Sequence, residues 1–265
     1  MNSVDLNVRL KDHYSIYEIF IMSRETIVQE IMNEIQDKCS NGDYIKDLLY
    51  YGDINIDTHW IGEGEIGNGR SFLIRAAHND KKDIVKILLE AGANPNVQDT
   101  MGCTALHYSG SVDVLQLLLD HHLTDPNLST GYGTSPLTAF VKSGRLRLVQ
   151  VILDHPLTNP NTQTGEGNTA LMYAAMLGNI KTIKAILDHP LTDPNIQTNM
   201  QETALMWGVE GGHLGVVQAI LKHPHTNPDI KNIRGNTALH FAFRKNYITI
   251  VEELLNHPSF KRQDI

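Results

Sequence analysis

The chain of 265 residues is 41% hydrophobic and 20% charged, a composition typical of a soluble globular protein with a core. Residues 1–66 hold 13 acidic and 5 basic side chains and so account for the whole formal net charge of −8, whereas residues 67–265 are neutral overall. This distribution argues against nonspecific nucleic-acid binding, which needs a strongly basic surface.

The sequence also lacks the signals of a membrane or secreted protein. No apolar run approaches the roughly 18 residues that a membrane helix needs, and the N-terminus shows no basic region followed by a long apolar stretch. Cys39 and Cys103 are the two cysteines, too few for a disulfide framework and compatible with a reducing compartment. We therefore expect a cytoplasmic protein without membrane insertion.

The N-terminal quarter holds no clear repeat motif. Residues 1–24 fit either a capping helix or an extended arm, and residues 25–57 show a helical spacing of apolar residues followed by a helix–turn pattern. We interpret residues 25–66 as a degenerate N-terminal capping repeat and a loop. The run GEGEIG at 62–67 has the spacing G-x-G-x-x-G, but its two glutamates would repel a phosphate, so we interpret it as a flexible loop.

Self-similarity dominates the rest of the chain. The triplet TAL recurs at 104–106, 169–171, 203–205 and 237–239, with the variants SFL at 71–73 and SPL at 135–137. Small residues follow the triplet, an aliphatic cluster comes next, and Asn-Pro or Asp-Pro ends the unit. This order predicts two short amphipathic helices and a β-turn, with Ser or Thr capping the first helix. A unit of this size cannot bury its own apolar face, so the copies must stack.

The repeated motifs resemble those of the ankyrin-repeat family. TALHYS (104–109), TALMYA (169–174), TALMWG (203–208) and TALHFA (237–242) resemble its T-P-L-H-x-A signature, and LLEAGANPNVQD (88–99) resembles its second-helix ending. The resemblance implies an all-α solenoid of paired antiparallel helices with β-turn or hairpin fingers, elongated and curved. It implies six repeats over 67–265, which we place at about 67–99, 100–130, 131–164, 165–198, 199–232 and 233–265.

Two departures from the ankyrin pattern bear on the structure. The second-helix ending becomes LDHPLTDPN at 187–195, with close copies at 119–127 and 153–161, and is one residue longer than in the family. Repeat two leaves little room between Leu106 and Leu115. We therefore expect its first helix to be shortened or distorted.

The longer ending places a histidine every 34 residues, at 121, 155, 189, 223 and 257. Neighbouring repeats stack at about helix-packing distance, roughly 8–10 Å. Zinc binds its nitrogen ligands at about 2.0–2.1 Å and needs three or four of them, and no third ligand recurs beside the histidines. We therefore predict that the histidines cap the last carbonyls of the second helices, and we expect no metal, cofactor or catalytic site.

Turn tips and the exposed ends of first helices form the predicted binding surface, because these positions face the partner in ankyrin-like proteins. Several are apolar where a bare scaffold would tolerate polar residues, which favours protein binding. The predicted partner-binding residues are Met101, Tyr132, Met176, Leu177, Asn199, Met200, Trp207, Glu210, Ile233, Arg234, Arg244 and Lys245. One repeat position carries an aromatic file of Tyr108, Tyr173, Trp207 and Phe241. Packing between first helices and anchoring of a partner are both open for this file.

We predict a non-enzymatic, monomeric scaffold for protein–protein interaction that binds partners through its concave face and finger tips. The basic residues of repeat six favour an acidic segment in the partner. Ankyrin repeats also occur in effectors that intracellular bacteria deliver to the host cytoplasm, and a stand-alone chain rich in Asn and Ile is compatible with that case. The alternative is a substrate-recruiting adaptor of a larger enzyme complex that uses the acidic N-terminal region. No nucleophile or paired acid–base constellation supports an enzyme.

Overall fold

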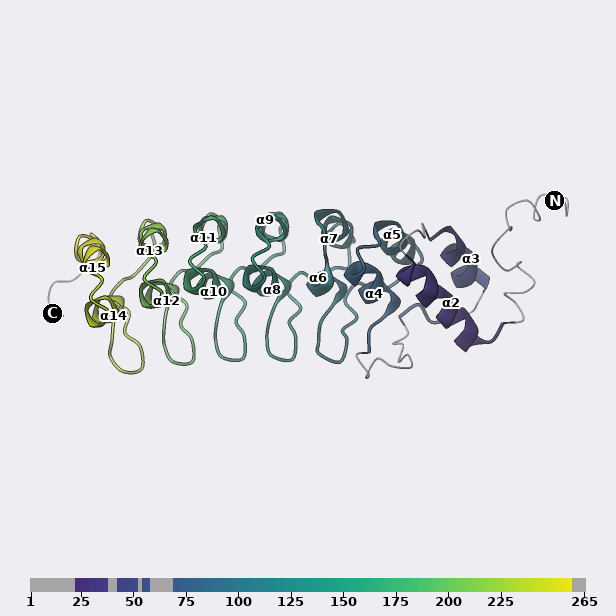
Figure 1. Cartoon of the computed structure of the whole chain (residues 1–265), viewed down its shortest axis with the longest axis horizontal. Helices are drawn as coiled ribbons and strands as arrows, with labels where there is room; N and C mark the ends of the chain where they lie inside the picture. Colours follow the sequence, from purple (N-terminus) through teal and green to yellow (C-terminus); the bar gives the residue numbers. More distant parts are fainter. Residues whose placement is uncertain (1–21, 38–41, 52–53, 58–68, 259–265) are drawn as a thin grey trace. The chain divides into compact units, whose positions relative to one another are not determined.

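A computed structural model describes residues 22–37, 42–51, 54–57 and 69–258 of the chain (Figure 1). These residues form helices joined by turns, with no strand among them, and the predicted all-α class is confirmed. They divide into two compact units, one ending at Asp125 and the other beginning at Pro126. The predicted arm at 1–24, apart from its last three residues, and the loop at 62–67 lie outside the described residues, as does Cys39.

The first unit consists of three helix pairs. They are α2 (Arg24–Gln36) with α3 (Asp43–Tyr51), α4 (Phe72–His78) with α5 (Lys82–Glu90), and α6 (Ala105–Tyr108) with α7 (Val112–Leu119). α2 packs on α4 and α4 on α6, while α3 packs on α5 and α5 on α7. Outside the helices, the carboxylate of Asp57 accepts a 2.9 Å hydrogen bond from the amide of Asn94. The N-terminal pair therefore packs on the next pair as a further repeat would, while the boundary at residue 66 stays a prediction.

Helix α6 is the shortened helix that the sequence predicts for repeat two. It has four residues, whereas α4 has seven. Ser109 follows it directly, and its buried hydroxyl donates to the carbonyl of Ala105. Ser111 then accepts from the Val114 amide and starts α7. Two closely spaced serines thus end one helix and begin the next, because their hydroxyls bond to nearby backbone groups in place of a further helical turn.

The second unit consists of four helix pairs. They are α8 (Pro136–Lys142) with α9 (Leu146–Asp154), α10 (Ala170–Met176) with α11 (Ile180–Leu187), α12 (Ala204–Glu210) with α13 (Leu214–Leu221), and α14 (Ala238–Arg244) with α15 (Ile248–Leu255). First helices pack on first helices and second helices on second helices along the unit. The unit therefore has two helical layers, and the turns that precede the first helices extend on one side of them (Figure 1).

The sequence explains why these short helices form and pack closely. Ser135, Thr169 and Thr203 each accept a hydrogen bond from the amide three residues later and so cap a first helix. Small residues bring the layers together: a Cβ added at Gly208 would lie 3.1 Å from Cγ1 of Val216. The apolar face of each second helix is buried between its neighbours, as the stacking of incomplete units requires.

Asparagine side chains link successive turns within the second unit. The side-chain amide of Asn161 donates to the Leu191 carbonyl, and its oxygen accepts from the Asp193 amide at 3.0 Å. Asn127 and Asn195 make the same two bonds to the turns that follow them. These bonds satisfy backbone groups that the proline-containing turns leave unpaired, so the asparagine of the repeat ties neighbouring copies together.

Threonines cap the second helices in the place predicted for the histidines. Thr158 is 1% exposed, and its hydroxyl donates to the carbonyl of Ile152 in the last turn of α9. The equivalent threonines make the same bond to α11 and α13. His155 instead accepts a 3.4 Å hydrogen bond from the Leu157 amide. The prediction of capping by histidine side chains is therefore wrong for His121, His155 and His189, because their ring nitrogens accept from the amide two residues later. It is confirmed for His257, whose Nε2 lies 3.0 Å from the carbonyl of Leu221, the last residue of α13.

Candidate functional site

Four fingers of the second unit, at 130–134, 164–168, 198–202 and 232–236, are hairpin turns of one design. The amide of the first residue donates to the carbonyl of the fifth at 2.9–3.0 Å. The side-chain oxygen of the first residue, a Thr or Asn, accepts from the amide of the fifth at 3.0–3.1 Å. The fourth residue has a positive φ, which glycine adopts without cost, but the third finger places Gln201 there at 59°. The predicted β-turn fingers are therefore present and closed at both ends.

Backbone hydrogen bonds also join neighbouring fingers. The amide of Gly165 donates to the carbonyl of Tyr132 at 2.9 Å, and the amide of Ile233 donates to the carbonyl of Met200 at 3.1 Å. Between these two, Asn199 donates to the Glu166 carbonyl at 3.0 Å. The tip side chains are thus carried on a connected backbone, which reduces the entropy that binding would otherwise cost.

Aromatic side chains of the first helices α12 and α14 lie next to the last two fingers. Trp207 lies on α12, and its indole N–H donates at 3.1 Å to the carboxylate of Glu202, in the finger that precedes this helix. Its ring lies nearly perpendicular to the ring of Tyr173 on α10, with 6.0 Å between the centroids. Phe241 lies on α14 and is 7% exposed. The packing role of the aromatic file therefore applies to Trp207, which also bonds to a finger, while anchoring of a partner stays a prediction.

Fingers and first helices together enclose a groove of about 450 Å³, which we name the finger–helix groove. It is lined by Met176, Met200, Glu202, Met206, Trp207, Glu210, Gly211, Asn232, Ile233, Arg234, Asn236, Phe241 and Arg244. Met176, Met200 and Ile233 are 48%, 54% and 60% exposed, so large apolar side chains stand open to water at its rim. Such an opening, apolar with a few polar groups, is the usual form of a binding site.

The charged side chains of the groove differ in whether they form ion pairs. Glu210 accepts from the Arg244 guanidinium at 2.9 Å and from the Lys245 ammonium at 2.7 Å. Partial burial would raise the pKa of Glu210, but the hydrogen bonds and charges of these two cations outweigh it, so the pKa lies below its ordinary value. The Arg234 guanidinium is exposed, and no described carboxylate lies within ion-pair distance of it.

Seven of the twelve predicted partner-binding residues line this one groove. They are Met176, Met200, Trp207, Glu210, Ile233, Arg234 and Arg244. Lys245 touches the same site through Glu210, and Asn199 is engaged between two fingers by its backbone and side chain. Tyr132 is 79% exposed on the first finger, and Leu177 is 50% exposed at the end of α10. Met101 belongs to the first unit, where it is 55% exposed.

Sequence reasoning missed groove residues that are buried or whose side chains close a finger. Met206 is 1% exposed and forms part of the lining, a position that the helical pattern assigns to the core. Asn232 closes the last finger by accepting from the amides of Arg234 and Asn236, both at 3.0 Å. Phe241 was identified through the aromatic file but not as a lining residue. That file and the first position of each finger were the available signals for two of these residues.

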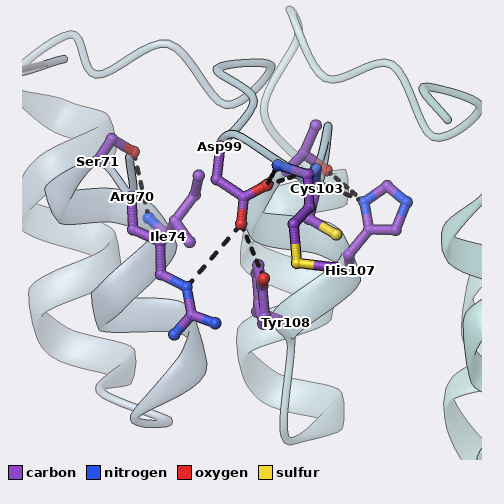
Figure 2. Close-up of polar contacts among 9 residues, drawn as sticks. Arg70, Ser71, Ile74, Asp99, Cys103, His107 and Tyr108 are labelled. Atoms are coloured by element: carbon purple, nitrogen blue, oxygen red, sulfur yellow. Dashed lines mark hydrogen bonds and ion pairs between the residues drawn. The ribbon is translucent and has the colours of Figure 1, made fainter. Parts of the chain in front are cut away.

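The first unit contains a buried polar cluster around Asp99, at the base of its finger (Figure 2). The Asp99 carboxylate accepts from the Tyr108 hydroxyl at 2.8 Å and from the amides of Met101 and Cys103, both at 2.9 Å. The guanidinium of Arg70 lies over the Tyr108 ring at 4.3 Å, and its Nε is 3.9 Å from the carboxylate. Asp99 therefore compensates its own burial with three donors and a nearby cation.

This cluster holds its reactive groups in their neutral forms. Burial and the negative charge of Asp99 raise the pKa of the Cys103 thiol. Burial and the hydrogen bond to Asp99 raise the pKa of the Tyr108 hydroxyl. A nucleophilic thiolate needs the opposite environment. The cluster thus has the chemistry of a finger support, and Tyr108 takes the packing role of the aromatic file.

Two absences hold within the described ranges. No helix there is long and apolar enough to cross a membrane. In the same residues, no three His, Cys, Asp or Glu side chains are grouped so that they could hold a metal ion.

Repeated helix pairs joined by hairpin fingers define a class of stacked-repeat proteins with an extended binding surface. A family profile described as "Ankyrin repeats (3 copies)" matches residues 31–130, 108–198 and 189–264. The chain belongs to the ankyrin-repeat family, and its repeats form a protein–protein interaction domain.

Relatives and solved structures agree with this family. The chain is 33% identical to neurogenic locus notch homolog protein 1 of Danio rerio over 137 residues, and 31% identical to notch homolog protein 2 of Homo sapiens over 138 residues. Each match covers 51% of this chain but only 5% of the notch protein, so the likeness concerns a small part of those relatives.

Two solved structures share the fold. The ankyrin repeat domain of Bcl-3, a member of the IkappaB protein family, has a TM-score of 0.70 at 21% identity, covering 86% of this chain and 96% of that one. An ankyrin repeat domain from Acinetobacter baumannii has a TM-score of 0.63 at 25% identity, covering 69% of this chain and 95% of that one. The Bcl-3 likeness concerns the fold alone.

Proposed function

We propose that this protein is a non-enzymatic scaffold that binds a protein partner in the finger–helix groove of its second unit. The observation that carries the proposal is the group of exposed apolar side chains Met176, Met200 and Ile233 around a groove lined by Trp207 and Phe241. Large apolar groups open to water in one place mark interaction sites, because their burial by a partner is favourable.

Physical features of the groove suit a protein segment. Aromatic and methionine side chains adapt to the shape of an apolar anchor, and aromatic residues are enriched among those that contribute most to binding. A backbone hydrogen bond from the amide of Ile233 to the carbonyl of Met200 joins the two fingers, so the rim is already ordered before binding. Burial of an apolar anchor then stabilises the complex by roughly 25 cal/mol per Å² of apolar surface removed from water, before the costs of association.

A pair of matched double variants of the full chain tests this proposal. Met200→Asp with Ile233→Asp places two charges at the groove, whereas Leu157→Asp with Leu191→Asp places two charges at exposed leucines of the proline-containing turns. We expect affinity capture and mass spectrometry to recover the same proteins with the wild type and the leucine variant, and to lose them with the groove variant. Equal recovery by both variants would refute binding in the groove.

The cellular setting follows from the sequence predictions alone. We infer a monomer that acts in the cytoplasm, which is the host cytoplasm if the chain is a bacterial effector. The adaptor alternative assigns a second partner to the acidic residues 1–66. Deletion of those residues separates the two cases, since the adaptor loses one group of captured proteins and keeps the other, whereas a simple scaffold keeps all of them.

A further inference from the structure

We propose that the finger–helix groove binds a peptide segment in which a large apolar side chain is followed or preceded closely by an Asp or Glu. The apolar side chain enters the groove, and the carboxylate meets the guanidinium of Arg234. This inference rests on the proposed function and adds the chemistry of the partner to it.

The size and the lining of the groove indicate which apolar side chain of the partner peptide fits into it. Its volume of about 450 Å³ falls in the lower part of the range of about 300–1,000 Å³ for binding sites. The groove therefore suits a few side chains better than a flat contact. Met206 and Phe241 are nearly buried and offer apolar surface, while Met200 and Ile233 stand at the rim. An apolar side chain that enters between them exchanges contact with water for contact with these four residues.

The ion pairs at the groove indicate where the acidic residue of the partner peptide binds. Three basic residues of the last repeat lie at the groove, but Arg244 and Lys245 are both bound by Glu210. Arg234 is the cation there that the described carboxylates leave without an ion pair, and it is exposed on the finger next to Ile233. A partner carboxylate at this position gains a contact with a planar guanidinium, whose geometry suits bidentate pairing, without breaking an existing ion pair.

The carboxylate of Glu202, which also lines the groove, influences where the acidic residue of the partner peptide lies. Glu202 accepts from the neutral indole N–H of Trp207, and among the described residues no cation forms an ion pair with it. It disfavours a partner carboxylate close to Trp207, because like charges repel, and so directs that group toward Arg234. The preference is therefore for an acidic residue on one side of the apolar anchor and not for a polyacidic segment.

An exposed arginine by itself contributes little to binding, since water screens it. Its effect grows when the apolar anchor beside it excludes water. A free anion lacks that anchor. These points favour a peptide over a small anionic ligand.

A phage-displayed library of random linear peptides, selected on the immobilised full chain, tests the inference. We expect the wild type to enrich peptides with Leu, Met, Phe or Trp close to Asp or Glu. On Arg234→Glu, we expect the apolar residue to persist while Lys or Arg replaces the acidic one. Arg147→Glu, the same exchange at an exposed residue of α9, is the matched control and should leave the wild-type preference unchanged.

A synthetic peptide from the wild-type selection then gives the size of the effect. Replacing its acidic residue by the corresponding amide should weaken binding to the wild type by about 2- to 5-fold, the range for an exposed ion pair. The same replacement should not weaken binding to Arg234→Gln. Fluorescence anisotropy of the labelled peptide measures both dissociation constants, and circular dichroism shows whether the variants keep their helices.

The results of these experiments distinguish a failure of this inference from a failure of the proposed function. Enriched peptides that lose binding to Met200→Asp with Ile233→Asp, but show no acidic preference or no response to Arg234→Glu, overturn the inference and leave the groove as the binding site. No enrichment, or enrichment that the groove variant does not affect, overturns both.

Discussion

The threonine of the repeated turn provides a quantitative test of how the second helices end. Thr158 is 1% exposed, and its hydroxyl donates to the Ile152 carbonyl. Thr158→Val keeps the shape of the side chain and removes the donor. The carbonyl retains one partner, because it also accepts from the His155 amide at 3.2 Å. The expected loss of stability is therefore about 1–1.5 kcal/mol, near the lower end of the range for breaking a buried hydrogen bond.

Thermal unfolding of the full chain, followed by circular dichroism at one scan rate, measures this change. A loss of 1 kcal/mol lowers Tm by about 2–4 °C for a domain of this size, so we expect a decrease of about 2–6 °C. His155→Ala in the same turn is the control, because it removes only the long, exposed bond to Leu157 and should cost about 0.5 kcal/mol or less. Thr158→Ser keeps the hydroxyl and should fall between the control and the valine variant.

Two results would refute the assignment of the cap to threonine. One is a Thr158→Val variant as stable as the wild type. The other is a larger loss in His155→Ala than in Thr158→Val, which would return the capping role to histidine.

Three further predictions use single substitutions read out by urea denaturation. Asn161→Ala removes two bonds to the next turn and should cost about 1–2 kcal/mol, whereas an unchanged midpoint would contradict the asparagine ladder. Gln201→Gly relieves a positive φ of 59° and should stabilise the chain by about 0.5–1 kcal/mol; a lower stability would show that the finger is unstrained. Glu210→Gln should cost at most about 1 kcal/mol at pH 7. Because the pKa of Glu210 is lowered, that difference should shrink as the pH falls below the ordinary glutamate value of 4.5 and vanish once the pH lies below the lowered pKa; a difference that persists in strong acid would exclude the ion pairs with Arg244 and Lys245.

Much of the fold could be predicted because the repeat is written in local signals. The Ser or Thr before α4, α8, α10 and α12 caps each helix through the amide three residues later, and the apolar spacing of the second helices follows the helical period. The short α6 was predictable by counting residues between Leu106 and Leu115. Each of these features depends on groups a few residues apart, which sequence spacing places directly.

The capping of the second helices shows where such reasoning fails. Histidine and threonine both recur once per repeat in the same turn, so periodicity cannot distinguish their roles. The direction of the chain after the proline decides it, since this returns the Thr158 hydroxyl to the end of α9 and leaves His155 beside the next amide. A three-residue difference in position was enough to exchange the two functions.

By itself, the sequence determined the repeating unit and the family, and it predicted a set of irregular positions as partner-binding. Tertiary structure decided which of those positions share one site. Met176 and Arg244 lie on different repeats and line the same groove only because the first helices stack. The same stacking brings Glu210 within 2.9 Å of Arg244 and leaves Arg234 open. Charges on separate repeats neutralise one another only across a packed interface, so the state of each cation depends on the packing and not on its place in the chain.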